Sequence, residues 1–406
     1  MVGALAVSGK AAIRVLAAEL RFYVRGVQEN SVSTMPERHP YILANGRIEP
    51  GTAAAIAQKL GAQTDPGESF CPSLAAPASG GDRPGGAASY QSENPAANGH
   101  EILDPCLWPL AALQLELVNI CNYRCPLCRT LRRDGVPRRQ MAADEVRRII
   151  DPIGGQLRDV ILYGTRGEPL LHPGLEEIIA DIKSATGARV SVSTNGSLVD
   201  ARRAAALLAS GLDQIVFAVD GITQETYGQY RVGGNLARVT SNLTGFCDLK
   251  MRGGYATRVV LQFIPMAANE HEIGDLAAFG YGLGADVVRL KFSNSVAKSA
   301  RFRTGDRRYR PAPHRTGRFR CPSGLEKLYV DPNGECYPCC YAEGHRHLSA
   351  GNALREDVAA IWHSERMWEL RRSFAEQKGF NRFCLDTCRG RAVYPKKILP
   401  RPGGAP

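Results

Sequence analysis

Long apolar runs are absent from this 406-residue sequence, so no segment is expected to cross a bilayer as a helix. The first residues, Met1 to about Val27, form an Ala-rich basic stretch that charges interrupt too often for the core of a secretory signal. We therefore expect a cytoplasmic protein. In that compartment the 12 cysteines favour metal binding over a disulfide framework.

The composition is otherwise ordinary for a folded protein, with 44% hydrophobic and 22% charged residues. The net charge of +11 favours anionic partners without identifying one. Apolar residues recur at helical spacing in the N-terminal stretch, which predicts a basic amphipathic helix. Such a helix could lie on a membrane or dock on a partner, and packing on its own domain is the simpler expectation.

Shifts in composition divide the chain into parts. We expect an N-terminal helical region of unassigned role (1–60), a Gly/Pro/Ser-rich linker (61–105), an α/β domain (106–300), a basic connector (301–320), a cysteine-containing domain (321–395) and a C-terminal tail (396–406). The connector is rich in arginine but has few interleaved aromatic residues, so we interpret it as a solvated link and expect no nucleic acid partner.

Strand-like and helix-like segments alternate through the α/β domain. Strands are expected at 114–118, 159–163, 189–193, 214–219, 258–264 and 287–292. Helices are expected between them, beginning at Ala143 and spanning 174–185, 201–210, 236–252 and 270–283. This alternation predicts βα units and a parallel sheet, whose functional residues lie at the carboxyl ends of the strands.

Three cysteines follow the first predicted strand in a C-x3-C-x2-C array: Cys121, Cys125 and Cys128. Three thiolates are one fewer than a structural zinc site or a fully ligated iron–sulfur cube needs. A catalytic cluster requires such an open position, because substrate or cofactor must reach the metal. A zinc knuckle with a distant fourth ligand, or three unrelated thiols, would account for the same spacing.

Polar turns end the next three predicted strands. Gly167, Glu168 and Pro169 end the second strand, where glycine allows close backbone approach and a carboxylate can accept from an ammonium group. Thr194 and Asn195 end the third strand, and Asp220 begins an Asp-Gly turn after the fourth. An Asp-Gly pair alone indicates only a turn. The agreement of all these positions at strand ends predicts a single site.

Together these motifs resemble the radical S-adenosylmethionine (SAM) enzymes. The resemblance implies a partial (β/α)6 TIM-type barrel, in which the three cysteines bind three irons of a [4Fe–4S] cluster and SAM chelates the fourth. It further implies that the Gly-Glu-Pro turn binds the SAM ammonium. Arg166 stands where that turn usually has its first Gly, a departure to which we attach no consequence. The remaining SAM-binding candidates at the strand ends are Thr194, Asn195, Asp220, Arg231 and Gln262.

A second cysteine array resembles the SPASM/twitch extension of the same enzymes, in its shortened form. The resemblance implies one auxiliary [4Fe–4S] cluster on Cys321, Cys339, Cys384 and Cys388. Cys336 or Cys340 could replace Cys339, and a structural zinc could occupy the same four thiolates. Four cysteine ligands leave no open iron, so such a cluster would exchange electrons rather than bind substrate.

The family resemblance implies reductive cleavage of SAM to a 5′-deoxyadenosyl radical, which abstracts hydrogen from a C–H bond. We expect an oxidoreductase that dehydrogenates a sugar or aminocyclitol hydroxyl, with an external electron donor such as flavodoxin or ferredoxin. Arg289 and Lys291, at the end of the sixth strand, are the candidates for substrate binding or the catalytic base. The alternatives are a maturase of a ribosomal peptide and, in another class, a non-catalytic metal module that binds nucleic acid.

Overall fold

The computed structural model describes residues 109–131, 136–309, 322–376 and 396–403. The expected N-terminal helical region and linker lie outside these ranges, as do Cys321, Cys384, Cys388 and part of the basic connector. Within the described ranges, no helix is both long and apolar enough to cross a membrane.

Six parallel strands form the centre of the sheet, and neighbours in sequence are neighbours in space. They are β1 (Ala112–Leu115), β2 (Asp159–Leu162), β3 (Arg189–Thr194), β4 (Gln214–Ala218), β5 (Arg258–Phe263) and β6 (Val287–Lys291). All five pairings between them are parallel. The predicted βα architecture is therefore confirmed, although β1 begins and ends earlier than the expected 114–118.

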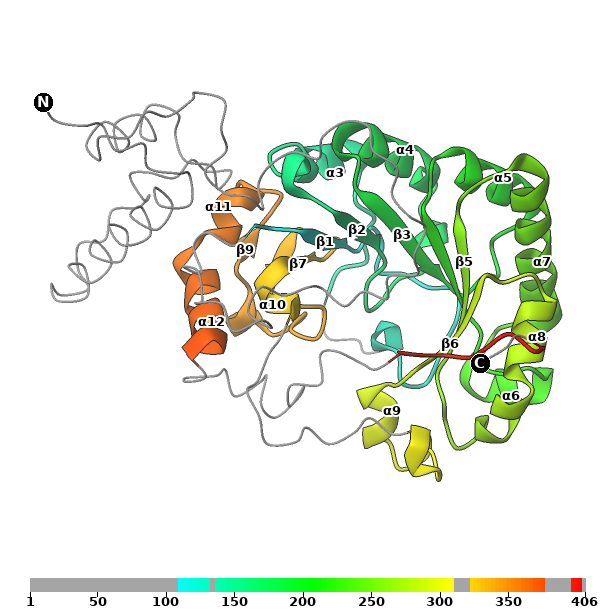
Figure 1. Ribbon diagram of the computed structural model, residues 1–406. Coiled ribbons are helices and arrows are strands. Elements are labelled where there is room, and N and C mark those ends of the chain that lie inside the picture. The colour runs from blue at the N-terminus through cyan, green and yellow to red at the C-terminus, as the bar shows by residue number, and fades with distance from the viewer. Residues whose placement is uncertain (1–108, 132–135, 310–321, 377–395, 404–406) are drawn as a thin grey trace, which may run out of the picture. The chain divides into compact units, whose positions relative to one another are not determined.

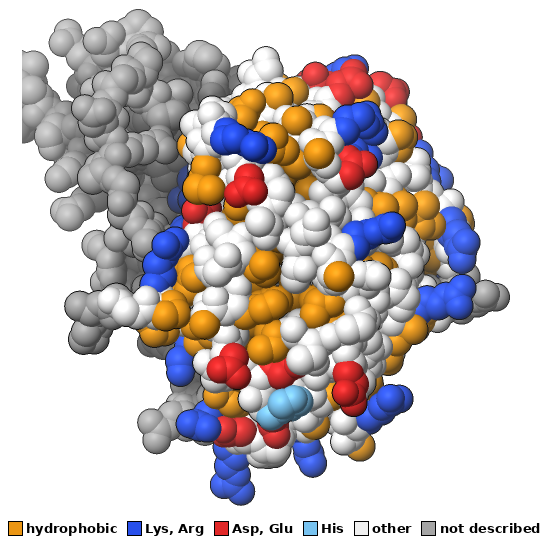
Figure 2. Space-filling view, turned by 90° about the vertical axis from the view of Figure 1, so that its right-hand side faces the viewer, with side chains coloured by type: hydrophobic (Ala, Val, Ile, Leu, Met, Phe, Trp, Pro, Cys, Tyr) orange, Lys and Arg blue, Asp and Glu red, His pale blue; other side chains and the backbone are white. Residues whose placement is uncertain are grey.

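Helices cover one face of this sheet (Figure 1). They are α3 (Ala143–Ile150), α4 (Leu175–Thr186), α5 (Ala201–Ala209), α7 (Leu236–Gly253) and α8 (Leu276–Gly282). Two shorter helices, α6 (Gln224–Tyr230) and α9 (Asn294–Lys298), follow β4 and β6 and lie below this layer in Figure 1. Side chains cap several of them in the expected way: Asp200 accepts from Arg203 N–H at α5, and Asn235 accepts from Arg238 N–H at α7. On this side of the surface, charged groups of both signs surround hydrophobic ones (Figure 2).

Two helical segments differ from the sequence-based expectation. Residues 270–283 are not one helix, because a 3₁₀ turn (Glu270–Gly274) precedes α8. Helix α6 was not predicted. Short 3₁₀ helices also occur at Arg129–Leu131, Gly154–Gln156, Pro169–Leu171, Arg307–Tyr309 and Arg346–Leu348.

The C-terminal part of the chain extends the same sheet at both edges. Strand β7 (Lys327–Val330) pairs parallel with β1, followed by antiparallel β8 (Glu335–Tyr337) and β9 (Gly351–Asn352). Helices α10 (Pro322–Glu326), α11 (Val358–Trp362) and α12 (Glu365–Glu376) accompany them. At the other edge, β10 (Lys396–Ile398) pairs antiparallel with β6, so this part of the expected tail is a strand.

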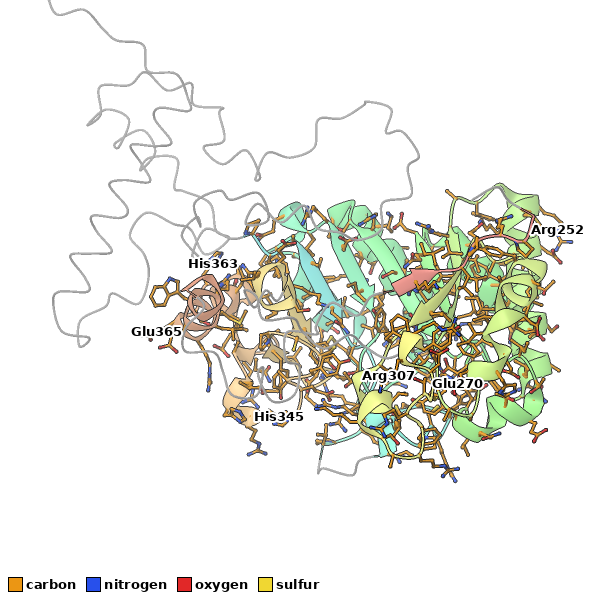
Figure 3. The ribbon with its side chains drawn as sticks, turned by 60° about the horizontal axis from the view of Figure 1, so that its bottom comes forward. Arg252, Glu270, Arg307, His345, His363 and Glu365 are labelled. Carbon is orange, nitrogen blue, oxygen red and sulfur yellow. The ribbon has the colours of Figure 1, made fainter. Side chains whose placement is uncertain are left out.

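The start of the basic connector is attached to the barrel rather than free. The Glu270 carboxylate accepts from the N–H groups of Gly305 and Asp306, each at 3.2 Å. Arg307 follows in the chain, and its side chain lies near Glu270 in Figure 3. Asp306 also forms a 2.6 Å ion pair with Arg308. These contacts hold residues 305–308 against the 3₁₀ turn that precedes α8.

The two faces of the sheet differ in chemistry. Because side chains alternate along a strand, one face carries Val160, Leu162 and their neighbours into the core beneath the helices. The opposite face has a small apolar layer of Val216, Val260 and Val287, which are adjacent in register. The next layer toward the strand ends changes to Ala218, Gln262 and Arg289. The inner face is thus apolar at the valine layer and becomes polar toward the carboxyl ends of the strands.

Candidate active site

The three cysteines of the first array lie in the loop that leaves β1. Hydrogen bonds fix the base of this loop, since Met141 N–H donates to the Leu117 carbonyl at 2.8 Å and Asn119 bonds residues 137 and 139. The loop is also tied to the α6–α7 turn, where Arg124 N–H donates to the Val232 carbonyl at 2.9 Å. Cys125 is buried, and Cys121 and Cys128 are half-buried.

The three thiols lie close enough to affect one another. Burial raises the pKa of Cys121 to about 12, and the neighbouring Cys128 and Cys125 contribute in the same direction. Burial also raises the pKa of Cys125, which the Arg231 guanidinium opposes. Arg231 Nη1 lies 4.0 Å from Cys125 Sγ. A cation beside a thiol stabilises the thiolate, which is the form that binds metal.

This donor set fits an iron–sulfur cluster. Within the described ranges, no three His, Cys, Asp or Glu side chains converge as a single-ion site requires. A cluster has no need of such convergence, because each thiolate binds a different iron. Cys121, Cys125 and Cys128 are therefore the residues that would hold it.

The Gly-Glu-Pro turn packs directly on the cysteine loop. Glu168 N–H donates to the Ile120 carbonyl at 2.9 Å. A Cβ added to Gly167 would lie 1.7 Å from the Val118 carbonyl oxygen, so only glycine allows this approach. The Glu168 carboxylate is buried and accepts from Thr194 Oγ1 at 2.6 Å, Asn195 N at 2.8 Å and Leu170 N at 3.2 Å. Burial raises its pKa, against these hydrogen bonds.

The end of β3 reaches the same place. Asn195 Nδ2 donates to Asn122 Oδ1 at 2.9 Å and lies 4.0 Å from Cys121 Sγ. The side-chain oxygen Oδ1 of Asn195 accepts from the Ser197 hydroxyl at 2.6 Å. Thr194 and Asn195 therefore link the Glu168 carboxylate to the cysteine loop.

A buried ion pair joins the end of β4 to α6. Asp220 is fully buried, and its Oδ2 accepts from both Nε and Nη2 of Arg231, at 2.7 and 2.6 Å. Its Oδ1 accepts from Ile264 N at 2.7 Å. Asn269 donates to the Asp220 carbonyl at 3.1 Å. The short helix α6, which sequence periodicity missed, is what returns Arg231 to Asp220 and Cys125.

The candidates from β5 and β6 lie side by side on the inner face. Arg289 donates to Gln262 Oε1 from Nη2 at 2.9 Å and from Nε at 3.3 Å. Burial lowers the pKa of Arg289, and the neighbouring Arg258 acts in the same direction. Lys291 is the next residue on this face of β6. Among the side chains described, no carboxylate pairs with Arg258, Arg289 or Lys291.

The second array is described only in part. Cys336 is fully buried in the main core, and burial raises its pKa above the usual range. Cys339 and Cys340 are half-buried in the loop after β8. This favours a core-packing role for Cys336, and it leaves both Cys339 and Cys340 as candidates. Cys321, Cys384 and Cys388 lie outside the described residues.

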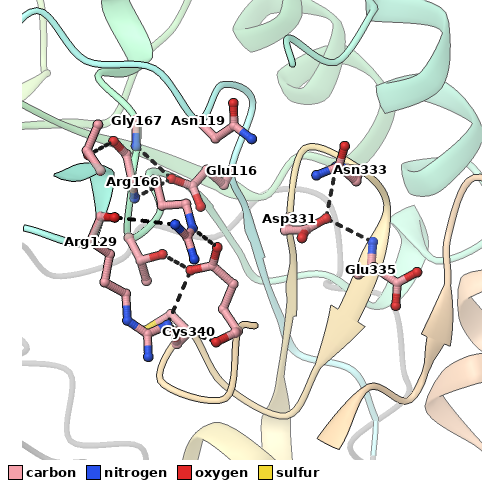
Figure 4. Close-up of polar contacts among 12 residues, drawn as sticks. Glu116, Asn119, Arg129, Arg166, Gly167, Asp331, Asn333, Glu335 and Cys340 are labelled. Atoms are coloured by element: carbon pink, nitrogen blue, oxygen red, sulfur yellow. Dashed lines mark hydrogen bonds and ion pairs between the residues drawn. The ribbon is translucent and has the colours of Figure 1, made fainter. Parts of the chain in front are cut away.

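Sequence reasoning attached no consequence to Arg166, and the structure corrects that view. Arg166 is 5% exposed, and its guanidinium donates to the Glu343 carboxylate of the C-terminal domain (Figure 4). Its backbone N–H donates at 2.7 Å to Glu116, a buried carboxylate that was not predicted. Glu343 lies 177 residues from Arg166, so no local pattern could have indicated the contact.

Comparison with known proteins identifies the class of site. Residues 115–278 match the model of the radical SAM superfamily, and residues 321–389 match the SPASM iron–sulfur cluster-binding domain. The chain therefore contains a radical SAM domain followed by a SPASM domain. These two domains imply [4Fe–4S] clusters and SAM as cofactors, as the motifs predicted.

Individual relatives differ in how much of the chain they match. The mycofactocin maturase MftC of Mycobacterium ulcerans is 26% identical over 334 residues, which cover 72% of this chain and 86% of the relative. A probable GTP 3′,8-cyclase of Methanothermobacter thermautotrophicus is 30% identical over 183 residues, 44% of this chain and 56% of the relative. The chain spans less than two thirds of this cyclase and of a second one from Methanococcus maripaludis, at 56% and 59%.

Solved structures share the fold at low sequence identity. Streptococcus suis SuiB bound to S-adenosylmethionine is 15% identical with a TM-score of 0.54, covering 72% of this chain and 73% of SuiB. SuiB bound to its precursor peptide SuiA is 16% identical with the same TM-score, covering 72% and 71%. These likenesses establish the fold.

Proposed function

We propose that the protein is a radical SAM oxidoreductase that modifies a ribosomally made peptide. The observation that carries the radical SAM chemistry is the contact of Asn195 and Arg231 with the thiols of Cys121 and Cys125. A peptide substrate is supported by MftC, a maturase that matches most of this chain, and by the SuiB fold, which was solved with a precursor peptide. The sugar or aminocyclitol substrate expected from the sequence stays a prediction.

When bound at these residues, SAM and its cluster would supply a 5′-deoxyadenosyl radical. Glu168 would orient the SAM ammonium. A carboxylate offers about four lone-pair sites, and three protein donors already bond to Glu168. The remaining site, on Oε2, would accept one ammonium hydrogen. Because Thr194 and Asn195 hold the carboxylate in place, it needs no reorganisation on binding.

We further propose that Arg289 and Lys291 receive an anionic group of the substrate, such as a peptide carboxylate. The pKa of Arg289 is lowered by burial and by Arg258, and the only hydrogen-bond acceptor found for its guanidinium in the described ranges is neutral Gln262. An anion there would supply the missing counter-charge. Lys291 also stays a candidate for the base that takes the substrate proton.

The auxiliary site would accept the second electron of the oxidation. Cys321, Cys384, Cys388 and either Cys339 or Cys340 would form a closed cluster suited to electron exchange. Hydrogen-atom abstraction removes one electron and one proton from the substrate. Lys291 is the candidate that would take the second proton, and a cluster held by these cysteines would supply an acceptor for the second electron. A small redox protein such as flavodoxin or ferredoxin would supply the electron for SAM cleavage.

The test of this proposal is anaerobic turnover with dithionite as the reductant. Wild-type protein should release 5′-deoxyadenosine, and the triple variant Cys121→Ala/Cys125→Ala/Cys128→Ala should release none and lose about four irons. The matched control is Cys247→Ala, a buried cysteine in α7 outside both arrays, which should retain the iron and the activity. SAM cleavage by the triple variant would refute the proposal.

The substrate class needs a second comparison. Wild-type protein is incubated with synthetic peptides from short reading frames beside its gene, and separately with a panel of aminocyclitols. We expect a peptide to lose the mass of two hydrogens in step with 5′-deoxyadenosine release. Oxidation of an aminocyclitol with no change in any peptide would refute the peptide assignment and leave the radical SAM assignment intact.

A further inference from the structure

A cluster of buried polar side chains joins the SAM-binding turn to the SPASM domain. We call Glu116, Arg129, Arg166, Tyr329 and Glu343 the inter-domain cluster, and Figure 4 labels the first three of them. Glu116 precedes the cysteine loop, Arg129 directly follows Cys128, and Arg166 belongs to the SAM turn. Tyr329 lies on β7, and Glu343 lies in the loop after Cys339 and Cys340. Four of the five are at most 5% exposed.

The ion pair between Arg166 and Glu343 lies at its centre. Arg166 Nε donates to Glu343 Oε1, and Arg166 Nη1 donates to the Arg129 carbonyl at 3.3 Å. The other carboxylate oxygen, Oε2, accepts from the Thr165 hydroxyl. Side chains of the Arg166 pair are 5% and 2% exposed, so water screens their attraction little. Two successive residues of the SAM turn thus bond to one carboxylate of the SPASM domain.

Arg129 makes the corresponding link from the first cysteine loop. Its Nη1 donates to the Glu343 carbonyl at 3.0 Å and lies 3.4 Å from Glu343 Oε2. Its Nη2 donates to the Tyr341 carbonyl at 3.1 Å, and the Cys340 carbonyl lies 3.5 Å from Nη1. The residue after Cys128 therefore binds the backbone beside Cys340. The two cysteine loops are connected through one guanidinium.

Glu116 binds the backbone of the Gly-Glu-Pro turn. Its Oε1 accepts from the N–H groups of Arg166 and Gly167, at 2.7 and 2.8 Å. Its Oε2 accepts from the Tyr329 hydroxyl on β7. The backbone of the SAM turn is therefore held by a carboxylate that the SPASM domain orients. No part of this arrangement follows from the Gly-Glu-Pro motif itself.

We propose that Arg166 and Glu343 are positioning residues that couple occupancy of the auxiliary cysteine site to the affinity of the SAM turn. Emptying the auxiliary site frees the loop that carries Glu343. The ion pair between Arg166 and Glu343 is then weakened, and the turn that holds Glu168 shifts. Because energetic coupling between two sites is reciprocal, bound SAM should also stabilise the auxiliary site. This inference rests on the proposed SAM and auxiliary-cluster sites.

The test is a double-mutant cycle on SAM binding, measured by equilibrium dialysis of anaerobically reconstituted protein with labelled SAM. One change empties the auxiliary site, through Cys384→Ser/Cys388→Ser, with the loss verified by iron content. The other is Glu343→Gln. Emptying the site should raise the SAM Kd about fivefold or more in the wild-type background and less than about twofold in the Glu343→Gln background.

Glu335→Gln is the matched control. Glu335 is another carboxylate of the same domain, and it bonds Ser349 and Asn352 within that domain. The fivefold effect should persist in this background. Loss of the effect with both Glu335→Gln and Glu343→Gln would assign it to general loosening of the domain and overturn the inference.

Two further outcomes would also overturn it: an unchanged SAM Kd when the auxiliary site is emptied, or an equal effect with and without Glu343. If Glu343→Gln does not fold, the double variant Arg166→Gln/Glu343→Gln removes both charges together and serves in its place. Failure of the wild-type protein to bind SAM would instead refute the proposed function. The iron content and the wild-type binding thus separate the two failures.

Discussion

Glu116 should make the stability of this protein fall as pH rises through the neutral range. Burial raises its pKa from the ordinary 4.5 to about 7, with Glu343 acting in the same direction. The folded state therefore binds this proton more tightly than the unfolded state. The stabilisation of the folded state by this bound proton is fully present below pH 4.5 and is lost as pH rises from 4.5 to about 7. At about 1.4 kcal/mol per tenfold change in proton affinity, the total loss is about 3 kcal/mol.

Urea unfolding between pH 5.5 and 8 measures the accessible part of this loss, about 2 kcal/mol. The comparison is with Glu116→Gln, in which the amide oxygen can still accept from Arg166 and Gly167 and the amide nitrogen can donate to the Tyr329 hydroxyl. Asp331, whose pKa burial raises to about 6, titrates in both proteins and cancels in the difference. The free energy of unfolding should decline with pH more steeply in the wild type. Parallel pH profiles would refute the reasoning.

Two other predictions concern the packing of the site. Asp220→Ala leaves Arg231 buried without its counter-charge and should lower the free energy of unfolding by about 3–5 kcal/mol. Asp144→Ala, which removes an exposed ion pair with Arg148, should lower it far less. Equal effects of the two substitutions in urea titrations would contradict this reasoning. Gly167→Ala should cost about 3 kcal/mol or more, because its Cβ cannot fit beside the cysteine loop. Gly245→Ala, on α7 where an added Cβ meets no other atom, should instead stabilise the folded protein by about 0.5–1 kcal/mol. If Gly245→Ala melts at a lower temperature than Gly167→Ala, the argument is wrong.

The sequence predicted the parts of the fold that local patterns specify. Each of the six parallel strands is an apolar run ending in polar or glycine-rich turns, and the long helices have the matching periodicity. Helix α6 is only seven residues long and lacks that periodicity, so its Thr223 cap was the one local signal. Strands β8 and β9, of three and two residues, are too short to leave a pattern.

The site divides in the same way. The cysteine spacing and the Gly-Glu-Pro turn are local motifs, and they predicted that the cofactor-binding residues lie at the strand ends. The contacts of Arg166 with Glu343 and of Glu116 with Tyr329 join residues 177 and 213 positions apart. Such pairs depend on the parallel pairing of β1 with β7, which no local signal encodes. Comparison with a family motif also directs attention away from Arg166, because the motif usually has Gly at that position and assigns no role to an arginine there.

The pairing of β7 with β1 and of β10 with β6 bears on how the chain is synthesised. Strand β1 is made early, yet its outer neighbour β7 follows about 215 residues later, and β10 is made last. A nascent chain that has completed β6 therefore has two open sheet edges with unpaired N–H and carbonyl groups. Open edges of this kind pair readily with other chains. The ribosome-bound barrel thus depends on its final segments to cover both edges, and slow long-range closure extends the time in which chaperones must protect them.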